Sequence, residues 1–204
     1  EPDFIINNIE TEIGSPQKYL VKYKSKNFYC NAHDLSNIYY FWQLSRAADN
    51  LIETDTPIIA EIGGGYGGQA LLYNQMFKYN AYTIFDLEPV CRLVDKYLGN
   101  FFLTGGIRAL DINKFPLGEK KFDLVISNYA FSELPKKLQE IYLNKVILNS
   151  KCGYMTMNTG YDLKGFRRES RYNCSELLDM LPNSRVIEEK PLTAKMNYII
   201  VWGE

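Results

Sequence analysis

Residues 58–68 read Ile-Ile-Ala-Glu-Ile-Gly-Gly-Gly-Tyr-Gly-Gly, and this stretch decides the fold. Its first five residues form a short, almost continuous apolar run with β-branched side chains, which is typical of a buried parallel strand. The glycines that follow predict a loop whose backbone comes close to a ligand, because glycine adopts positive φ and carries no Cβ. A helical pattern then runs over 69–79. Strand, glycine loop and helix together predict a site for a bound small molecule.

The rest of the chain alternates strands and helices. Apolar runs predict strands over 81–85, 107–110, 122–128 and 154–157, and helical patterns lie over 90–98, 135–149 and 174–181. Two further strands, over 185–189 and 197–202, are separated by only a few residues, which predicts one antiparallel strand at the end of the chain. We therefore expect an α/β fold: a Rossmann-like, seven-stranded, mostly parallel sheet with an antiparallel last strand.

The N-terminal residues have a different character. Between Tyr19 and Leu51 apolar residues recur at spacings of three and four, which predicts a helix with Asp34 or Ser36 as its N-cap. We expect two parts: a helical N-terminal cap over 1–55 that packs on the sheet as a lid, and a sheet domain over 56–204.

The composition excludes several classes of protein. The 204 residues include 23 Lys plus Arg and 24 Asp plus Glu, so no excess of positive charge is available to bind nucleic acid. Four cysteines without a C-x-x-C pair and a single histidine give no support for a metal site or a disulfide framework. No apolar run approaches the roughly 20 residues that a membrane span needs. We expect a cytoplasmic protein with reduced thiols.

Two classes of cofactor fit the glycine loop. Gly63, Gly65 and Gly68 match the G-x-G-x-x-G pattern of dinucleotide-binding proteins, which favours a nicotinamide or flavin cofactor. S-adenosylmethionine instead carries a cationic amino group, and Glu61, an odd residue for a buried strand end, would pair with it. Asp86 ends the second strand and would accept hydrogen bonds from ribose hydroxyls in either class, so it does not discriminate. Glu61 favours S-adenosylmethionine.

At this point the sequence resembles the class I S-adenosylmethionine-dependent methyltransferases. The run Glu61-x-Gly63-x-Gly65-x-Gly67 is similar to the first motif of that superfamily, and residues 122–128 resemble its fourth-strand motif. The resemblance covers about residues 56–204 and implies S-adenosylmethionine as the cofactor. The cofactor-binding residues that it implies are Glu61, Gly63, Gly65, Tyr66, Gly67, Gly68, Asp86 and Leu87, with Asp111 and Ile112 beside the adenine, and Asn128.

A narrower resemblance is to the sugar O-methyltransferases of bacterial polysaccharide loci. It rests on residues 61–68, on Ile-Phe-Asp-Leu-Glu-Pro at 84–89 and on Ser-Asn-Tyr-Ala-Phe-Ser-Glu-Leu at 127–134. This resemblance implies that the methyl acceptor is a sugar hydroxyl, in a polysaccharide or a sugar-nucleotide building block. The alternatives are an NAD(P)-dependent oxidoreductase and a cofactor-binding accessory protein without catalytic activity.

Methyl transfer to an alcohol requires removal of the hydroxyl proton. The candidate bases are Glu133, just after the fourth strand, and His33, the only imidazole, in the N-terminal cap. We expect Glu133 to be the base and His33 to position the sugar, because only Glu133 follows a strand end of the sheet domain. A helix-dipole carboxylate and a surface histidine are the ordinary alternatives.

Basic residues gather between the fifth strand and the next helix, at Lys164, Arg167, Arg168 and Arg171. A solvated loop would explain this run, but arginines there would also bind an anionic acceptor, such as a sugar nucleotide, through bidentate phosphate contacts. The residues expected to bind the acceptor are Asn158, Tyr161, Arg167, Arg168 and Asn197.

Overall fold

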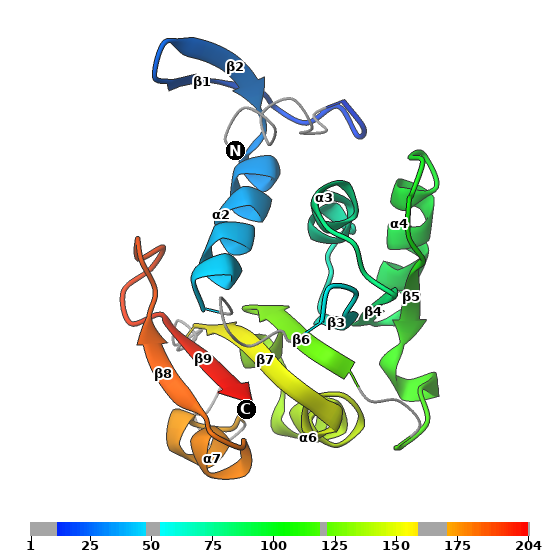
Figure 1. The fold of residues 1–204 in the computed structure, drawn as a ribbon, viewed down its shortest axis with the longest axis vertical. Helices are drawn as coiled ribbons and strands as arrows, with labels where there is room; N and C mark the ends of the chain where they lie inside the picture. Colours follow the sequence, from blue (N-terminus) through cyan, green and yellow to red (C-terminus); the bar gives the residue numbers. More distant parts are fainter. Residues whose placement is uncertain (1–11, 48–53, 119–121, 159–170, 204) are drawn as a thin grey trace.

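The computed structural model describes residues 12–47, 54–118, 122–158 and 171–203. Its main sheet consists of β3 (Ile58–Ile62), β4 (Ala81–Asp86), β5 (Ile107–Asp111), β6 (Phe122–Asn128), β7 (Ser150–Met157), β8 (Arg185–Glu188) and β9 (Tyr198–Gly203). The strand order is β5-β4-β3-β6-β7-β9-β8, and β9 pairs antiparallel with both of its neighbours (Figure 1). The other pairings are parallel. The structure thus confirms the predicted Rossmann-like sheet.

Helices cover both faces of this sheet. They are α2 (Ala32–Ala47), α3 (Gly68–Met76), α4 (Glu88–Leu98), α5 (Ala130–Glu133), α6 (Lys136–Lys145) and α7 (Cys174–Met180), with short 3-10 turns η1 (Ile112–Lys114) and η2 (Ile147–Asn149). In Figure 1, α2, α3 and α4 lie on one face and α6 and α7 on the other. Alternate residues of β3 serve the two cores: Ile59 packs with α3, and Ile62 packs with α6.

The N-terminal cap is not helical throughout. Residues Tyr19–Tyr23 (β1) and Lys26–Cys30 (β2) form an antiparallel hairpin, so the expectation of a helix from Tyr19 is wrong for this segment. Val21 and Phe28 pair on the half-buried face, and Lys24 turns the chain with a φ of 53°. Aromatic and β-branched residues at alternate positions suit this pairing. The apolar residues that gave the helical spacing, from Ile38 onward, lie in α2.

Helix α2 begins one turn earlier than the expected caps. The Asn31 side-chain oxygen accepts a hydrogen bond from the Asp34 backbone N–H at 2.9 Å, and its amide donates to the Asp34 carboxylate at 2.8 Å. Asn31 is therefore the N-cap, and Asp34 is its reciprocal partner in the first turn. The Ser36 hydroxyl donates instead to the carbonyl of Ala32.

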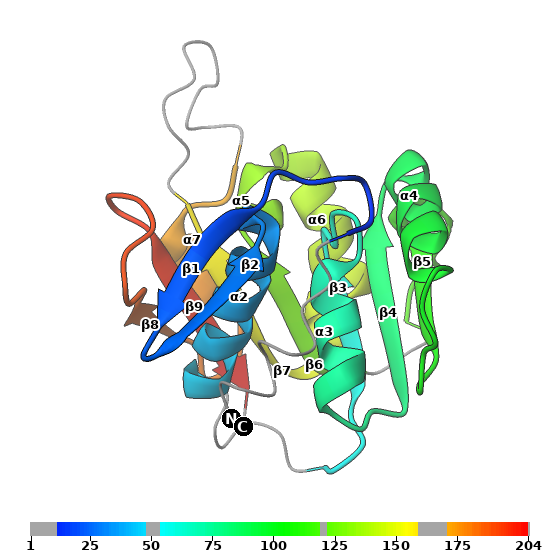
Figure 2. The same cartoon turned by 90° about the horizontal axis from the view of Figure 1, so that it is seen from above.

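The cap helix packs against the helix that follows the glycine loop. The Phe41 ring lies 5.4 Å from Tyr73 and 5.2 Å from Phe77, centroid to centroid. A Cβ on Gly68 would lie 2.4 Å from the Asn37 side-chain nitrogen, so the start of α3 approaches α2 closely. Figures 1 and 2 together show the hairpin beyond the N-terminal end of α2. Among the described residues no helix is long and apolar enough to cross a bilayer.

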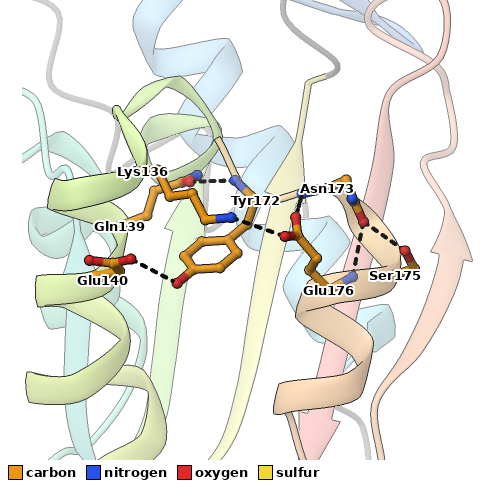
Figure 3. Close-up of polar contacts among 7 residues, drawn as sticks. All are labelled: Lys136, Gln139, Glu140, Tyr172, Asn173, Ser175 and Glu176. Atoms are coloured by element: carbon orange, nitrogen blue, oxygen red, sulfur yellow. Dashed lines mark hydrogen bonds and ion pairs between the residues drawn. The ribbon is translucent and has the colours of Figure 1, made fainter. Parts of the chain in front are cut away.

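A polar cluster joins α6 to α7 on the opposite face (Figure 3). Lys136 pairs with Glu176 at 3.0 Å and lies 4.3 Å from the centre of the Tyr172 ring. The Tyr172 N–H donates to Gln139, and Asn173 caps α7 through a reciprocal pair with Glu176. These contacts hold the start of α7 against the sheet domain.

Candidate functional site

The glycine loop lies at the carboxyl end of β3. Its backbone is fixed by a hydrogen bond from the Gly63 N–H to the Phe85 carbonyl and another from Gly67 to Gly64. Gly65 has a φ of 56°, and a Cβ built on it would meet no atom within 4 Å. Gly63 is needed for packing, because its Cβ would lie 2.1 Å from the Cβ of Ala130. The loop is therefore open at Gly65, where a ligand can approach its backbone.

Glu61 lies beneath this loop rather than on its surface. Its side chain is 3% exposed and accepts a hydrogen bond from the Tyr82 hydroxyl at 2.9 Å. Burial raises the pKa of Glu61 to about 7, although the Tyr82 bond acts in the opposite direction. The charge expected to pair with a ligand cation is thus only partly present at neutral pH.

The acids at the ends of β4 and β5 are neighbours, because Asp86 and Asp111 pair in the sheet register. The Asp86 carboxylate accepts from the Leu87 N–H at 2.7 Å and from the Gly64 N–H, so it joins the strand end to the loop. Asp111 accepts from Asn113 and caps the η1 turn. The Ile112 side chain is fully buried in the core, whereas Leu87 is 47% exposed. Asp86, Leu87 and Asp111 therefore share one edge of the sheet.

A cavity of about 540 Å³ lies beside these acids, between α4 and β5. Its lining includes the charged side chains of Glu88, Arg92, Asp95, Arg108, Asp111 and Lys114. Its volume is within the range of small-molecule sites.

Asn128, at the end of β6, reaches across to α3. Its amide donates to the Gln69 side-chain oxygen at 2.6 Å. The Gln69 side-chain nitrogen is buried without a hydrogen-bond partner, which is rare for a folded protein. Gln69 is absent from the residues expected from the sequence, because a glutamine in the first turn of a helix carries no local signal.

The two candidate bases lie on different elements. The exposed Glu133 accepts a hydrogen bond from the Asn158 amide at 2.9 Å, and Asn158 in turn binds the Ser132 hydroxyl. The structure thus brings Glu133 and Asn158 together. The exposed His33 lies edge-on to Tyr66 of the glycine loop, 5.8 Å between ring centres.

Of the remaining residues expected near the methyl acceptor, some lie within the described part of the chain and others do not. Asn197 lies in the loop between β8 and β9 and donates to the Thr193 hydroxyl at 3.0 Å. Arg171 donates to the Ser132 carbonyl, next to Glu133. Tyr161, Lys164, Arg167 and Arg168 fall outside the described residues.

A cluster of polar residues around Glu189 has no signal in the sequence. Glu189 is fully buried, and it accepts hydrogen bonds from the hydroxyls of Tyr39 and Tyr129 and from the backbone N–H and hydroxyl of Thr193. Burial alone would raise the pKa of Glu189, but these donors outweigh it and hold the pKa below its ordinary value. The cluster joins α2, the turn after β6 and the β8–β9 loop, and no pattern within one segment reveals it.

Comparison with known proteins supports the fold. No protein-family model matches the sequence, and no curated protein matches it significantly. The methyltransferase domain of bacterial CtHen1-CN is similar in structure, with a TM-score of 0.59, 10% identity, and coverage of 85% of this chain and 100% of that one. Magnesium protoporphyrin IX methyltransferase from Synechocystis PCC 6803 gives a TM-score of 0.55 and 12% identity, over 83% of this chain and 81% of that one.

Mitomycin 7-O-methyltransferase MmcR gives a TM-score of 0.54 at 16% identity. The match covers 82% of this chain but only 53% of MmcR, so this chain spans about half of that protein. At such low identities these similarities show the fold alone. The chain has the Rossmann-like fold that S-adenosylmethionine-dependent methyltransferases share.

Proposed function

We propose that this chain is an S-adenosylmethionine-dependent O-methyltransferase and that its acceptor is a sugar hydroxyl. The observation that carries the cofactor assignment is the loop open at Gly65, with the Asp86 carboxylate bonded to the Gly64 N–H and a buried Gln69 side-chain nitrogen without a hydrogen-bond partner in the helix that follows. The sugar acceptor is proposed from the resemblance of residues 61–68, 84–89 and 127–134. Two proteins of this fold, magnesium protoporphyrin IX methyltransferase and PigF, have structures with S-adenosylhomocysteine, the demethylated product of this cofactor.

The residues present fit the cofactor. Asp86 has a carboxylate at the strand end that would accept hydrogen bonds from the two ribose hydroxyls. Asp111 and the exposed Leu87 would flank the adenine, and the Gly65 backbone would face the methionine part. The Ile112 side chain is buried, so this residue would contact the cofactor only through its backbone. When bound, S-adenosylmethionine supplies an activated methyl group.

Glu133 is the proposed base. The Asn158 amide holds one oxygen of its carboxylate, which leaves the other free to take the proton of the acceptor hydroxyl. Its exposed position at the carboxyl edge of the sheet suits contact with a ligand. The exposed His33, next to Tyr66, would contact the acceptor from the cap side.

Calorimetric titration tests the cofactor assignment. We expect the protein to bind S-adenosylhomocysteine and not NADH, and the reverse result would favour an oxidoreductase. Mass spectrometry after incubation with S-adenosylmethionine and a panel of sugars and sugar nucleotides then tests the acceptor. Cofactor binding without any methyl transfer across the panel would favour a non-catalytic accessory protein.

A further inference from the structure

Tyr129 has a backbone conformation that its residue type disfavours. Its φ is 64°, in the left-handed region, which is strained for a bulky aromatic residue. Hydrogen bonds enforce this geometry: the Tyr129 N–H donates to the Thr156 carbonyl at 2.9 Å, and the Tyr129 carbonyl accepts from the backbone and hydroxyl of Ser132. Glycine or asparagine would adopt it at lower cost. The position therefore points to a role for the tyrosine side chain.

Glu189 fixes the direction of the Tyr129 hydroxyl. Glu189 is buried and ionised, so its carboxylate accepts a hydrogen bond from the Tyr129 hydroxyl. An ionised carboxylate has no proton of its own to donate to Tyr129. Burial, together with Glu189, raises the pKa of Tyr129, which keeps the phenol neutral. Tyr129 is thus no base. Its oxygen has lone pairs left for hydrogen bonds from other hydroxyls, and the Thr193 hydroxyl lies 2.7 Å away.

Tyr129 and Glu133 lie at the same end of β6. Tyr129 is the N-cap of α5 and Glu133 is the last residue of that helix, so both follow the carboxyl end of the strand within one helical turn. The Tyr40 ring of α2 is edge-on to the Tyr129 ring at 5.8 Å. The proposed base and the fixed tyrosine therefore share this edge of the sheet, where Thr193 and Asn197 continue the row of polar groups from the Tyr129 hydroxyl.

We propose that Tyr129 accepts a hydrogen bond from a second hydroxyl of the methyl acceptor, next to the one that is methylated, and that Glu189 is its positioning residue. The inference rests on the proposed function, because it takes Glu133 as the base for the reacting hydroxyl. It narrows the acceptor to a molecule with two neighbouring hydroxyls, as on a pyranose ring.

The test uses sugar binding to the protein loaded with S-adenosylhomocysteine. The probes are the methyl α-pyranosides of glucose, galactose, mannose and rhamnose, followed by saturation-transfer NMR. We expect at least one to bind the wild type and to bind Tyr129→Phe about tenfold more weakly, the effect of one lost hydrogen bond of about 1.4 kcal/mol. Tyr79→Phe is the matched control, because it removes a buried tyrosine hydroxyl bonded to Asn74 at the other end of the strands.

A spectroscopic readout separates positioning from a purely structural role. With tyrosine labelled at ¹³Cζ, the Tyr129 resonance should move on addition of the sugar in the wild type. It should not move in Glu189→Gln, because the glutamine amide can donate to the Tyr129 oxygen and so occupy the lone pair that the sugar hydroxyl would use. Thr193→Ala, at an exposed position, gives a second variant if Tyr129→Phe fails to fold, and its sugar affinity should also fall severalfold.

The outcomes are distinct. Equal sugar affinity of the wild type and Tyr129→Phe, or of the wild type and Thr193→Ala where that variant is used, overturns this inference and leaves the proposed function standing. A Tyr129 resonance that moves equally in Glu189→Gln overturns the positioning role. No binding of S-adenosylhomocysteine overturns the proposed function itself, and cofactor binding without any sugar binding overturns both the sugar acceptor and this inference.

Discussion

Glu61→Gln should remove a penalty that the fold places on a buried charge. The pKa of Glu61 is about 7 in the folded chain against an ordinary value of 4.5. Because the folded value is the higher one, the stability that this group contributes is complete below about pH 4.5 and is lost as the pH rises through 7. By linkage the loss at pH 8 is about 3 kcal/mol, at about 1.4 kcal/mol for each pH unit between the two values.

Urea unfolding of both proteins between pH 4.5 and pH 8 measures this. We expect the free energy of unfolding of Glu61→Gln, relative to wild type, to rise by about 3 kcal/mol over that range. The glutamine oxygen can still accept from Tyr82, and any cost of burying its amide is independent of pH. Glu140→Gln is the matched control, since Glu140 accepts from Tyr172 at 3.3 Å but is exposed. A difference that stays constant with pH would refute the reasoning.

Three further predictions concern the proposed site. Gly65→Val should abolish binding of S-adenosylhomocysteine in calorimetry while circular dichroism shows a folded chain, because the side chain would occupy the open face of the loop at a φ of 56°; retained affinity would argue against ligand approach there. Asp86→Asn should weaken that binding by about tenfold or more, because a charged acceptor is lost. Glu88→Gln should change it little, since the Glu88 carboxylate pairs with Arg92, and equal effects of the two substitutions would contradict the ribose assignment. Glu133→Gln should lower turnover by about 10²-fold with unchanged cofactor affinity, and a larger effect of His33→Gln would exchange the two roles.

Local patterns account for most of the fold but not for the cap. The sequence predicts a strand over residues 122–128, the bounds that β6 has, because Leu124, Val125 and Ile126 form a continuous apolar run that is buried in the sheet. The strand β7 begins at Ser150, earlier than expected, since Lys151 and Gly153 interrupt the apolar run. The hairpin was missed because its side chains are mostly exposed and give no buried face to detect.

The candidate site likewise has a part that the sequence predicts and a part that it does not. Asp86 and Asp111 are the last residues of β4 and β5, and Gly65 lies three residues after the end of β3, so sequence order alone places them on one edge of the sheet. The Tyr39–Glu189 bond joins residues 150 positions apart, and the Tyr129–Glu189 bond joins residues 60 apart. Such contacts depend on how the cap and the β8–β9 loop pack together, which no single-segment pattern carries.

The two buried glutamates differ in their donors, and this difference sets where charge resides near neutral pH. Glu61 accepts from one tyrosine, so burial prevails and its pKa rises to about 7. Glu189 accepts from two tyrosines and a threonine, so its pKa falls and its contribution to stability is lost only as the pH drops below about 4.5. At pH 7 the protein therefore holds a permanent negative charge on the proposed acceptor side. Beneath the glycine loop, the ammonium group of bound S-adenosylhomocysteine would complete the ionisation of Glu61 and release a proton. Binding near pH 7 should therefore show a heat that depends on the ionisation enthalpy of the buffer, and Glu61→Gln should abolish that dependence.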